Sequence, residues 1–305
     1  MLEIMGKTHI DFIGMRKYAF IISGILASLG LLALVQIARG EANLGIDFSG
    51  GTAVQLKFDK PVPIDEARHA MTAAGFPDAE LQEFTAGNKL LIRVKEQKTI
   101  EENVAERIVQ IFEKGFAGNH FVVDSSTAIG PTIGRELQQK AVIAIFFSMI
   151  GIVLYIAARF EFRFGIAAAI ATFHDVLAVL GILHLLNAEI TLLIVTALLT
   201  LAGYSLTDTV VVFDRIRENL KFRRRESLEE LINGGINQVL SRTIVVSLTV
   251  VLVLVALFFF GGEVIHDFSF TLLIGVLIGT YSSVFVASPL LVIWKGSAGK
   301  LLKRV

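Results

Sequence analysis

Cysteine is absent from the sequence, which excludes a disulfide framework, a thiolate zinc or iron–sulfur site and a cysteine nucleophile. An excess of charge is absent too, because 28 basic and 28 acidic side chains give a formal net charge of 0; this argues against a nucleic-acid binder. Charged residues make up only 18% of the chain, less than the roughly 25% of soluble domains. Apolar residues make up 54%, which excludes disorder. The class that remains is a multi-pass membrane protein.

The common sequence patterns of catalytic sites are also missing. The chain has no Gly-x-x-x-x-Gly-Lys-Ser/Thr loop for nucleotide phosphates, no His-Glu-x-x-His pair for zinc and no Gly-x-Ser-x-Gly nucleophile elbow. Asp175 and Asp208, the two acids expected inside the membrane, lack the Gly-x-Gly-Asp motif of aspartyl intramembrane proteases. We therefore expect no enzymatic activity, no organic cofactor and no bound metal.

Long apolar runs dominate what is present. A bilayer core of about 30 Å needs about 20 apolar residues per helical span, and six stretches meet this requirement. They are residues 18–37, 141–158, 164–186, 190–213, 243–262 and 268–294. The expected fold is a polytopic α-helical membrane protein with six transmembrane helices, of which residues 141–294 hold helices 2–6.

Lys and Arg are unevenly distributed among the connections, and this asymmetry predicts the side on which each connection lies. The N-terminal residues 1–17, the loop 214–242 and the tail 295–305 are rich in Lys and Arg. The short loops 187–189 and 263–267 contain neither. Both termini are therefore expected on the cytoplasmic side.

Residues 39–140 form a connection too long to lack a fold of its own. The residue pattern predicts the order strand, helix, strand, strand, helix, strand, which is typical of a ferredoxin-like α+β domain, here extracytoplasmic (periplasmic). The strands are expected at 52–58, 80–84, 90–94 and from 121, and the helices at 64–74 and 99–116. An edge strand could bind an extended polypeptide or a partner domain; alternatively, the domain is a compact spacer with protected edges.

Two glycine-rich segments flank this domain and are typical of tight turns where the chain leaves or re-enters the membrane. Their distinctive residues are Gly45, Asp47, Gly50 and Gly51 after the first span, and Gly130, Pro131 and Gly134 before the second.

Charged residues follow the fourth span, beginning with Asp214 and Arg215. Attractive and repulsive pairs within this segment largely cancel, so we expect contacts to other loops or partners. Further along, Ser227 and Glu230 form a capping-box pattern, which predicts a short amphipathic helix on the membrane face that ends at Gly234-Gly235.

Asp208 is the strongest functional candidate inside the membrane, because an ionised carboxylate at that depth costs at least about 2.5–3.5 kcal/mol. Thr196, Thr200 and Tyr204 precede it at intervals of four residues, and Thr207 adjoins it. Together they predict a polar stripe on one helix face that would line a hydrated path. The alternative is a carboxylic acid kept neutral or paired for packing.

His174 and Asp175 lie midway along the third span. One hypothesis makes them a second proton-relay station, in which His174 titrates near neutrality. The other makes them a hydrogen-bonding anchor that joins the third and fourth spans.

Four segments carry a resemblance to a known family: residues 45–52, residues 130–137, the His174-Asp175 pair, and residues 203–219, which read GYSLTDTVVVFDRIREN. They are similar to SecF, a family of membrane subunits of the bacterial protein-translocation machinery that belongs to the resistance–nodulation–division class of proton-coupled transporters. The resemblance covers the whole chain. It implies a location in the bacterial cytoplasmic (inner) membrane and contacts with SecD, the SecYEG channel, SecA, YajC, the exported polypeptide and membrane lipid, and with no nucleic acid.

Arg242 lies where the loop after the fourth span returns into the fifth, so it could approach Asp208. The resemblance places both residues in the proton path. Burial disfavours an ionised carboxylate and a nearby guanidinium favours it, so movement of Arg242 would make Asp208 release and rebind a proton. For Arg242, ordinary cationic flanking of a span is the alternative.

The absence of catalytic motifs predicts a non-enzymatic protein, and the resemblance implies a subunit that, with SecD, uses the proton gradient to complete polypeptide translocation. Two alternatives remain open at this point. The chain could be half of a proton-coupled exporter of small amphipathic molecules, or a translocon scaffold in which the polar groups serve only assembly.

Overall fold

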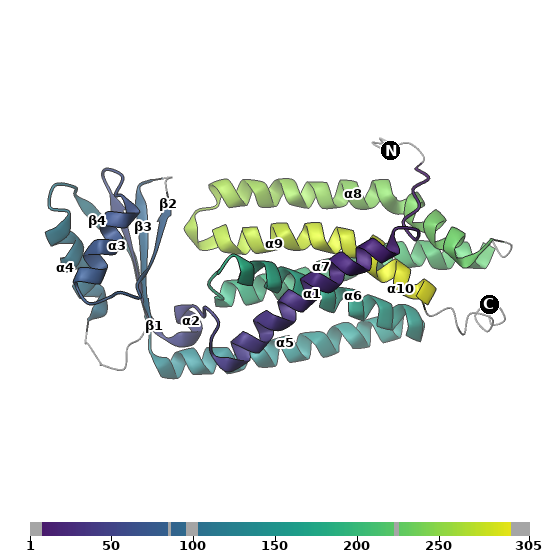
Figure 1. Ribbon diagram of the computed structural model, residues 1–305, viewed down its shortest axis with the longest axis horizontal. Coiled ribbons are helices and arrows are strands. Elements are labelled where there is room, and N and C mark those ends of the chain that lie inside the picture. The colour runs from purple at the N-terminus through teal and green to yellow at the C-terminus, as the bar shows by residue number, and fades with distance from the viewer. Residues whose placement is uncertain (1–7, 85–86, 96–102, 223–225, 294–305) are drawn as a thin grey trace. The chain divides into compact units, whose positions relative to one another are not determined.

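The computed structural model describes residues 8–84, 87–95, 103–222 and 226–293. Expectations for Lys7, for the start of the helix at 99–116, for the arginines at 223–225 and for the tail 295–305 lie outside these residues. The chain divides into two compact units (Figure 1). One comprises Met1–Ala42, Ile145–Ala188 and Leu193–Val305, and the other Asn43–Ala144 and Glu189–Leu192.

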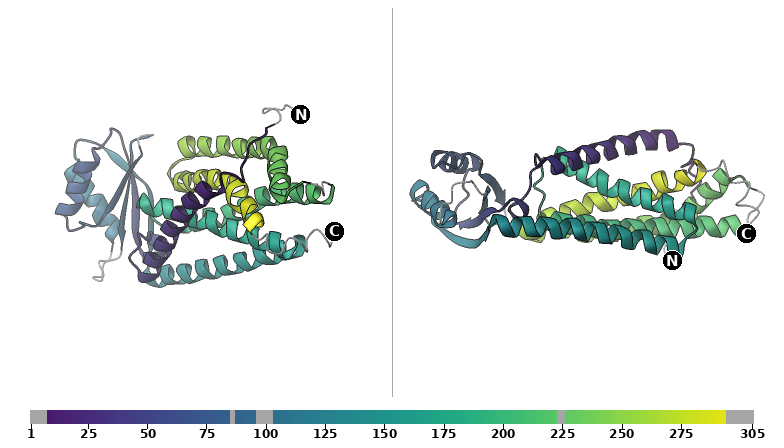
Figure 2. Two further views of the ribbon diagram at one scale, coloured as in Figure 1. Left: turned by 45° about the vertical axis from the view of Figure 1, so that its right-hand side comes forward. Right: turned by 90° about the horizontal axis from the view of Figure 1, so that it is seen from below.

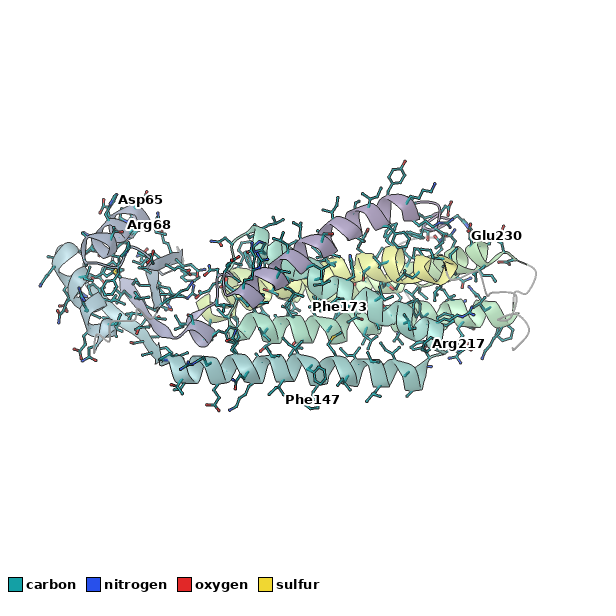
Figure 3. The ribbon with its side chains drawn as sticks, turned by 60° about the horizontal axis from the view of Figure 1, so that its bottom comes forward. Asp65, Arg68, Phe147, Phe173, Arg217 and Glu230 are labelled. Carbon is teal, nitrogen blue, oxygen red and sulfur yellow. The ribbon has the colours of Figure 1, made fainter. Side chains whose placement is uncertain are left out.

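Within the described residues, six helices are long and apolar enough to cross a membrane, which confirms the expected six. They are α1 (Arg16–Arg39), α5 (Pro131–Arg159), α6 (Phe162–Leu185), α7 (Leu192–Phe222), α8 (Leu228–Phe260) and a sixth span built from α9 (Glu263–Ser282), the π-helical segment η1 (Ser283–Ala287) and α10 (Ser288–Ile293). Phe147 on α5 and Phe173 on α6, labelled in Figure 3, are exposed, as expected of lipid-facing side chains.

The segment 214–242, expected to be a loop, is largely helical, because α7 extends to Phe222 and α8 begins at Leu228. The capping box at the start of α8 is confirmed, since the Ser227 hydroxyl accepts from the Glu230 backbone and the Glu230 carboxylate accepts from the Ser227 N–H. The predicted helix end at Gly234-Gly235 is wrong. Gly235 lies so close to α7 that a Cβ would come within 2.8 Å of Ile216 Cγ1, and neither glycine has the positive φ of a helix C-cap.

Glycine also brings α1 and α6 together (Figure 2). A Cβ on Gly30 would overlap the Leu177 carbonyl, and one on Gly181 would come within 2.7 Å of the Gly30 nitrogen. Small residues at such a crossing allow two backbones to touch, which favours helix association in a membrane.

The second unit contains the α+β domain, which has the expected ferredoxin-like order. Its elements are α2 (Ile46–Ser49), β1 (Gly51–Phe58), α3 (Ile64–Ala73), β2 (Glu80–Phe84), β3 (Lys89–Lys95), α4 (Val104–Gly115) and β4 (Phe121–Ile129). The four strands pair antiparallel in the order β2-β3-β1-β4, and α3 and α4 cover one face of the sheet (Figures 1 and 2). Between sheet and helices lies an apolar core that includes Val54, Leu56, Ile92, Met71 and Phe112.

Strand β4 forms one edge of the sheet. Its start at Phe121 was predicted, and the strand extends to Ile129. Its residues 122–128 are exposed, and its pairing with β1 shifts register between Gln55 and Leu56. Gln55 and Lys89 both contact Asp124 at this irregularity, at 2.5 and 2.8 Å.

Candidate functional site

Asp208 lies in a cluster of hydroxyl groups contributed by three helices. The Ser247 hydroxyl of α8 donates to Asp208 Oδ2 at 3.5 Å. Tyr204, one turn before Asp208 on α7, donates to Ser247 at 3.4 Å, and Thr280 of α9 lies 2.7 Å from the same hydroxyl. The Asp208 side chain is buried, and among the described residues its hydrogen-bond donor is the neutral Ser247 hydroxyl.

The expected polar stripe divides into two parts. Thr196, Thr200 and Thr207 are exposed along α7, whereas Tyr204 is half-buried and points into the cluster. The hydroxyls of Thr200 and Thr207 donate to backbone carbonyls of their own helix, those of Thr196 and Tyr204. The stripe therefore leads along the surface of α7 to the buried Asp208.

Arg242 is exposed, and within the described residues no ion pair joins it to Asp208. The α8 residue that faces Asp208 is instead Ser247, five residues further along that helix. The structure thus does not bring the expected pair together in this conformation. Sequence reasoning missed Ser247 and Thr280, because a lone hydroxyl in an apolar helix gives no local signal of the direction in which it points.

Among the described residues, Asp175 has more and shorter hydrogen bonds than Asp208. Its Oδ2 accepts from the hydroxyls of Ser205 on α7 and Ser282 at the end of α9, the latter at 2.7 Å, and its Oδ1 lies 2.9 Å from His174 Nδ1. The side chain is completely buried. This is the geometry of the interhelical anchor, and it adds the sixth span to the two helices that were expected to meet there.

Several other buried polar atoms near these groups in sequence have no hydrogen-bond partner among the described residues. They are the hydroxyls of Thr172, Thr209 and Thr243 and the Nε2 of His174. Buried polar groups are usually satisfied by protein or by ordered water, so these positions favour local hydration of the helix bundle.

At the end of α7, Asp214 pairs with Arg159 at the end of α5, with 2.7 Å between Oδ2 and Nη2. Arg215 donates to Gln238 of α8 at 2.6 Å and pairs with Glu218 of its own helix at 2.6 Å. Contacts to other loops or partners were expected here, whereas the structure joins Asp214 and Arg215 to the neighbouring helices α5 and α8 and pairs Arg215 with Glu218 within α7.

The two glycine segments flanking the domain pack against each other. Gly134, in the first turn of α5, lies so close to α2 that a Cβ would come within 2.9 Å of the Phe48 carbonyl oxygen and 3.0 Å of the Gly50 nitrogen. Gly50 and Gly51 have φ of 77° and 140°, which disfavours any other residue there. The N–H of Gly45 donates to the Ile190 carbonyl at 2.9 Å. In contrast, a Cβ on Gly130 would meet nothing within 4 Å, and Pro131 occupies the first position of α5 as expected.

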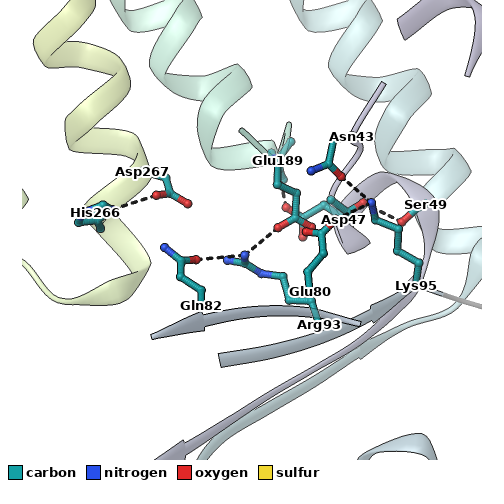
Figure 4. A network of polar contacts seen from close by, with 12 residues as sticks. Asn43, Asp47, Ser49, Glu80, Gln82, Arg93, Lys95, Glu189, His266 and Asp267 are labelled. Carbon is teal, nitrogen blue, oxygen red and sulfur yellow. Dashed lines mark hydrogen bonds and ion pairs between the residues drawn. The ribbon is translucent and has the colours of Figure 1, made fainter. Parts of the chain in front are cut away.

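The loop between α6 and α7 forms hydrogen bonds with the first of these glycine-rich segments, residues 45–52. Asp47 Oδ2 accepts from the N–H of Leu192, the first residue of α7, at 2.9 Å. Arg93 of β3 pairs with Glu189 at 2.8 Å and donates to Gln82 of β2 at 3.2 Å (Figure 4). Sequence reasoning treated this loop only as a short connection, because nothing local links residues about 100 to 145 positions apart.

Across the described ranges, no group of three or more His, Cys, Asp or Glu side chains is arranged to hold a metal ion. The groups that surround Asp208 and Asp175 are carboxyl, imidazole and hydroxyl groups inside a helix bundle.

Six membrane-crossing helices and one small α+β domain inserted after the first of them define a multi-pass α-helical membrane protein. Two family models match the chain: "Protein export membrane protein SecD/SecF, C-terminal" over residues 109–297, and "SecD/SecF GG Motif" over residues 42–62. Protein translocase subunit SecF of Thermodesulfovibrio yellowstonii is 49% identical over 295 residues, covering 96% of this chain and 97% of the relative. The SecF subunit of Calditerrivibrio nitroreducens is 42% identical and covers 96% of both chains. The chain belongs to the SecD/SecF family of protein-export membrane proteins and is a subunit of the Sec translocase.

A solved structure agrees with this assignment. The crystal structure of SecDF, a translocon-associated membrane protein from Thermus thermophilus, matches with a TM-score of 0.81 and 37% identity over 95% of this chain. The match covers 39% of the SecDF chain, so this chain spans about two fifths of that protein's length.

Proposed function

We propose that this translocase subunit, acting with SecD, uses the proton gradient to drive the later stages of polypeptide export, and that Asp208 carries the proton. The role is non-enzymatic, and the proton is the coupling ion. SecD is the proposed partner because SecD and SecF are joined in the name of the matching SecDF protein. Contacts with SecYEG, SecA and YajC stay predictions from the family resemblance.

The observation that supports Asp208 most directly is the contrast between the two buried carboxyl groups. Asp175 accepts two hydroxyl hydrogen bonds and lies against His174, so a change in its protonation would disrupt three helices at once. Within the part of the chain that the structure describes, Asp208 has one long hydrogen bond, from Ser247, and it lies beside the exposed polar stripe of α7. A proton can therefore reach and leave Asp208 at a smaller structural cost.

The proposed role of Arg242 requires a movement of α8. In this conformation it is exposed and Ser247 occupies the position facing Asp208. A shift of α8 that exchanged Ser247 for the guanidinium would favour the ionised carboxylate, and its return would favour the protonated acid. One charge moved through 100 mV is worth about 2.3 kcal/mol, enough to bias such a two-state motion substantially.

The test replaces Asp208 with Asn, which preserves shape and removes ionisation, and measures export into inverted membrane vesicles with the proton gradient intact or collapsed by an ionophore. We expect normal amounts of assembled protein and loss of the gradient-dependent part of export. Asp65→Asn, at an exposed acid that pairs with Arg68 on α3, is the matched control (Figure 3). Full gradient dependence in an assembled Asp208→Asn variant would exclude the proton role and leave the scaffold function.

A further inference from the structure

The α6–α7 loop is attached to the domain by three kinds of contact. Ile190 exchanges two backbone hydrogen bonds with the segment before α2: its carbonyl accepts from Gly45 at 2.9 Å, and its N–H donates to Asn43 at 2.8 Å. Glu189 forms an ion pair with Arg93, and Asp47 accepts from the N–H of Leu192. Residues 189–192 thereby belong to the compact unit of the domain rather than to that of the helices.

The ion pair is the most enclosed of these contacts. The side chains of Arg93 and Glu189 are 18% and 6% exposed, far less than in the surface pair of Arg68 and Asp65 at 56% and 82%. Removal of one partner from a pair enclosed in this way leaves an uncompensated charge, so a single substitution at either residue should destabilise the docked loop. The Arg93 guanidinium also donates a hydrogen bond to the side-chain oxygen of Gln82 (Figure 4).

Asp47 occupies a rigid position on the domain. It lies in α2, whose close approach to Gly134 and whose connection through Gly50 into β1 leave little freedom. Its carboxylate satisfies an N–H at the start of α7 that no residue within that helix can accept, and the negative charge interacts favourably with the helix dipole. The domain therefore provides the N-terminal cap of α7 from 145 residues away in sequence.

Helix α7 runs without interruption from this cap to Asp208, 16 residues further on, or about 24 Å along a helix. A continuous helix transmits an axial or tilting displacement of one end to the other. We propose that Asp47, Arg93 and Glu189 are positioning residues that couple α7 to the domain, so that the movement accompanying proton transfer at Asp208 displaces the domain. This inference rests on the proposed proton-driven function.

Substitutions at Asp47 separate coupling from folding. Asp47→Ala removes the acceptor, whereas Asp47→Asn keeps a side-chain oxygen that can accept from Leu192. In the full chain reconstituted with its co-purifying membrane subunits, we expect about tenfold faster amide hydrogen exchange at Leu192 in Asp47→Ala and a much smaller change in Asp47→Asn. The ratio of export with the gradient to export without it should fall toward 1 in Asp47→Ala and recover in Asp47→Asn. Asp65→Ala is the matched control and should leave both measurements unchanged.

The ion pair offers an independent second test. Arg93→Glu and Glu189→Arg should each abolish the gradient-dependent part of export, and the double variant, which restores opposite charges in exchanged positions, should recover it. Loss in the single variants without recovery in the double variant would contradict coupling through this pair. Wild-type export ratios in Asp47→Ala and both single variants would overturn the inference altogether.

Failure of the coupling is distinguishable from failure of the proton role. Infrared difference spectra of the Asp208 carboxyl report protonation directly, and the coupling predicts that this signal persists in Asp47→Ala while the export ratio falls. If the wild type itself shows no gradient dependence and no carboxyl signal, the proposed function is wrong. If the wild type shows both and Asp47→Ala retains both, only the coupling is wrong.

Discussion

At the scale of single residues, the hydrogen bonds of Asp175 indicate a structural role. Asp175→Ala removes the acceptor shared by Ser205 and Ser282, and we expect a loss of about 1–3 kcal/mol in the free energy of unfolding, since hydrogen bonds inside membrane proteins contribute about 0.6–1.7 kcal/mol each. Asp175→Asn keeps one oxygen and should lose less. Thermal unfolding in mild detergent measures both. A variant of normal stability with no gradient-dependent export would instead support the relay hypothesis for this residue.

Asp124 gives a residue-scale prediction that depends on pH. The hydrogen bond from Lys89 lowers the pKa of the Asp124 carboxyl below its ordinary value of 3.8. A carboxyl with a lower pKa in the folded than in the unfolded state stabilises the fold above the unfolded pKa, and this contribution is lost as the pH falls through the folded pKa. The pairing of β1 with β4 should therefore weaken below about pH 4.

Amide hydrogen exchange in β4, compared between the wild type and Asp124→Asn at equal pH, tests this effect without interference from the pH dependence of intrinsic exchange. Protection in the wild type should exceed that in Asp124→Asn at pH 6, and the two should converge as the pH approaches 3. A difference independent of pH would show that Lys89 does not stabilise the ionised form. Because Asp124 is largely solvated, the expected effect is small.

At the scale of elements, two adjacent glycines of α8 serve different purposes. Gly235→Ala places a methyl group within 2.8 Å of Ile216 Cγ1 and 3.2 Å of its Cα, and such overpacking costs about 1–3 kcal/mol. Gly234→Ala meets only Asn219 Nδ2 at 4.0 Å and should stabilise the helix by about 0.5–1 kcal/mol, because alanine loses less backbone entropy than glycine. Unfolding midpoints of the two variants should shift in opposite directions. Equal shifts would mean that the α7–α8 approach is looser than described.

Periodicity and apolar length were sufficient to predict the membrane spans, the strands and the helices α3 and α4, but not the short α2, which lies in a segment expected to be a tight turn, nor all of the ends and contacts. The β2 strand at 80–84 and the six spans were predicted because each carries its signal in its own residues. The continuation of α7 beyond Phe213 and of α8 beyond Gly235 was missed, because these segments are polar outside and apolar only where Ile216, Ile232 and Ile236 pack together. The hydroxyl environment of Asp208 and the cap that Asp47 gives to α7 depend on tertiary packing, which no local pattern encodes.

At the scale of the whole molecule, the number of crossings fixes the side of each segment once one is known. The domain lies between the first and second spans, so it is on the opposite side from the N-terminus, and the connection between the fourth and fifth spans is on the same side as the N-terminus. Basic residues near the N-terminus and beyond α7 predict that this shared side is the cytoplasm. With this orientation, we expect the α+β domain on the extracytoplasmic side, where an emerging polypeptide would meet it.

Single-cysteine variants test this orientation, because the chain contains no cysteine of its own. Asp65→Cys on α3 should react with a membrane-impermeant maleimide in cells whose outer barrier has been made permeable and whose inner membrane is intact. Glu218→Cys, which is exposed near the end of α7, should react only after the inner membrane is disrupted. Equal export activity of the two variants before labelling serves as the control for folding. The reverse labelling pattern would place the domain in the cytoplasm, and there it could not pull a polypeptide outward, whatever the protonation of Asp208.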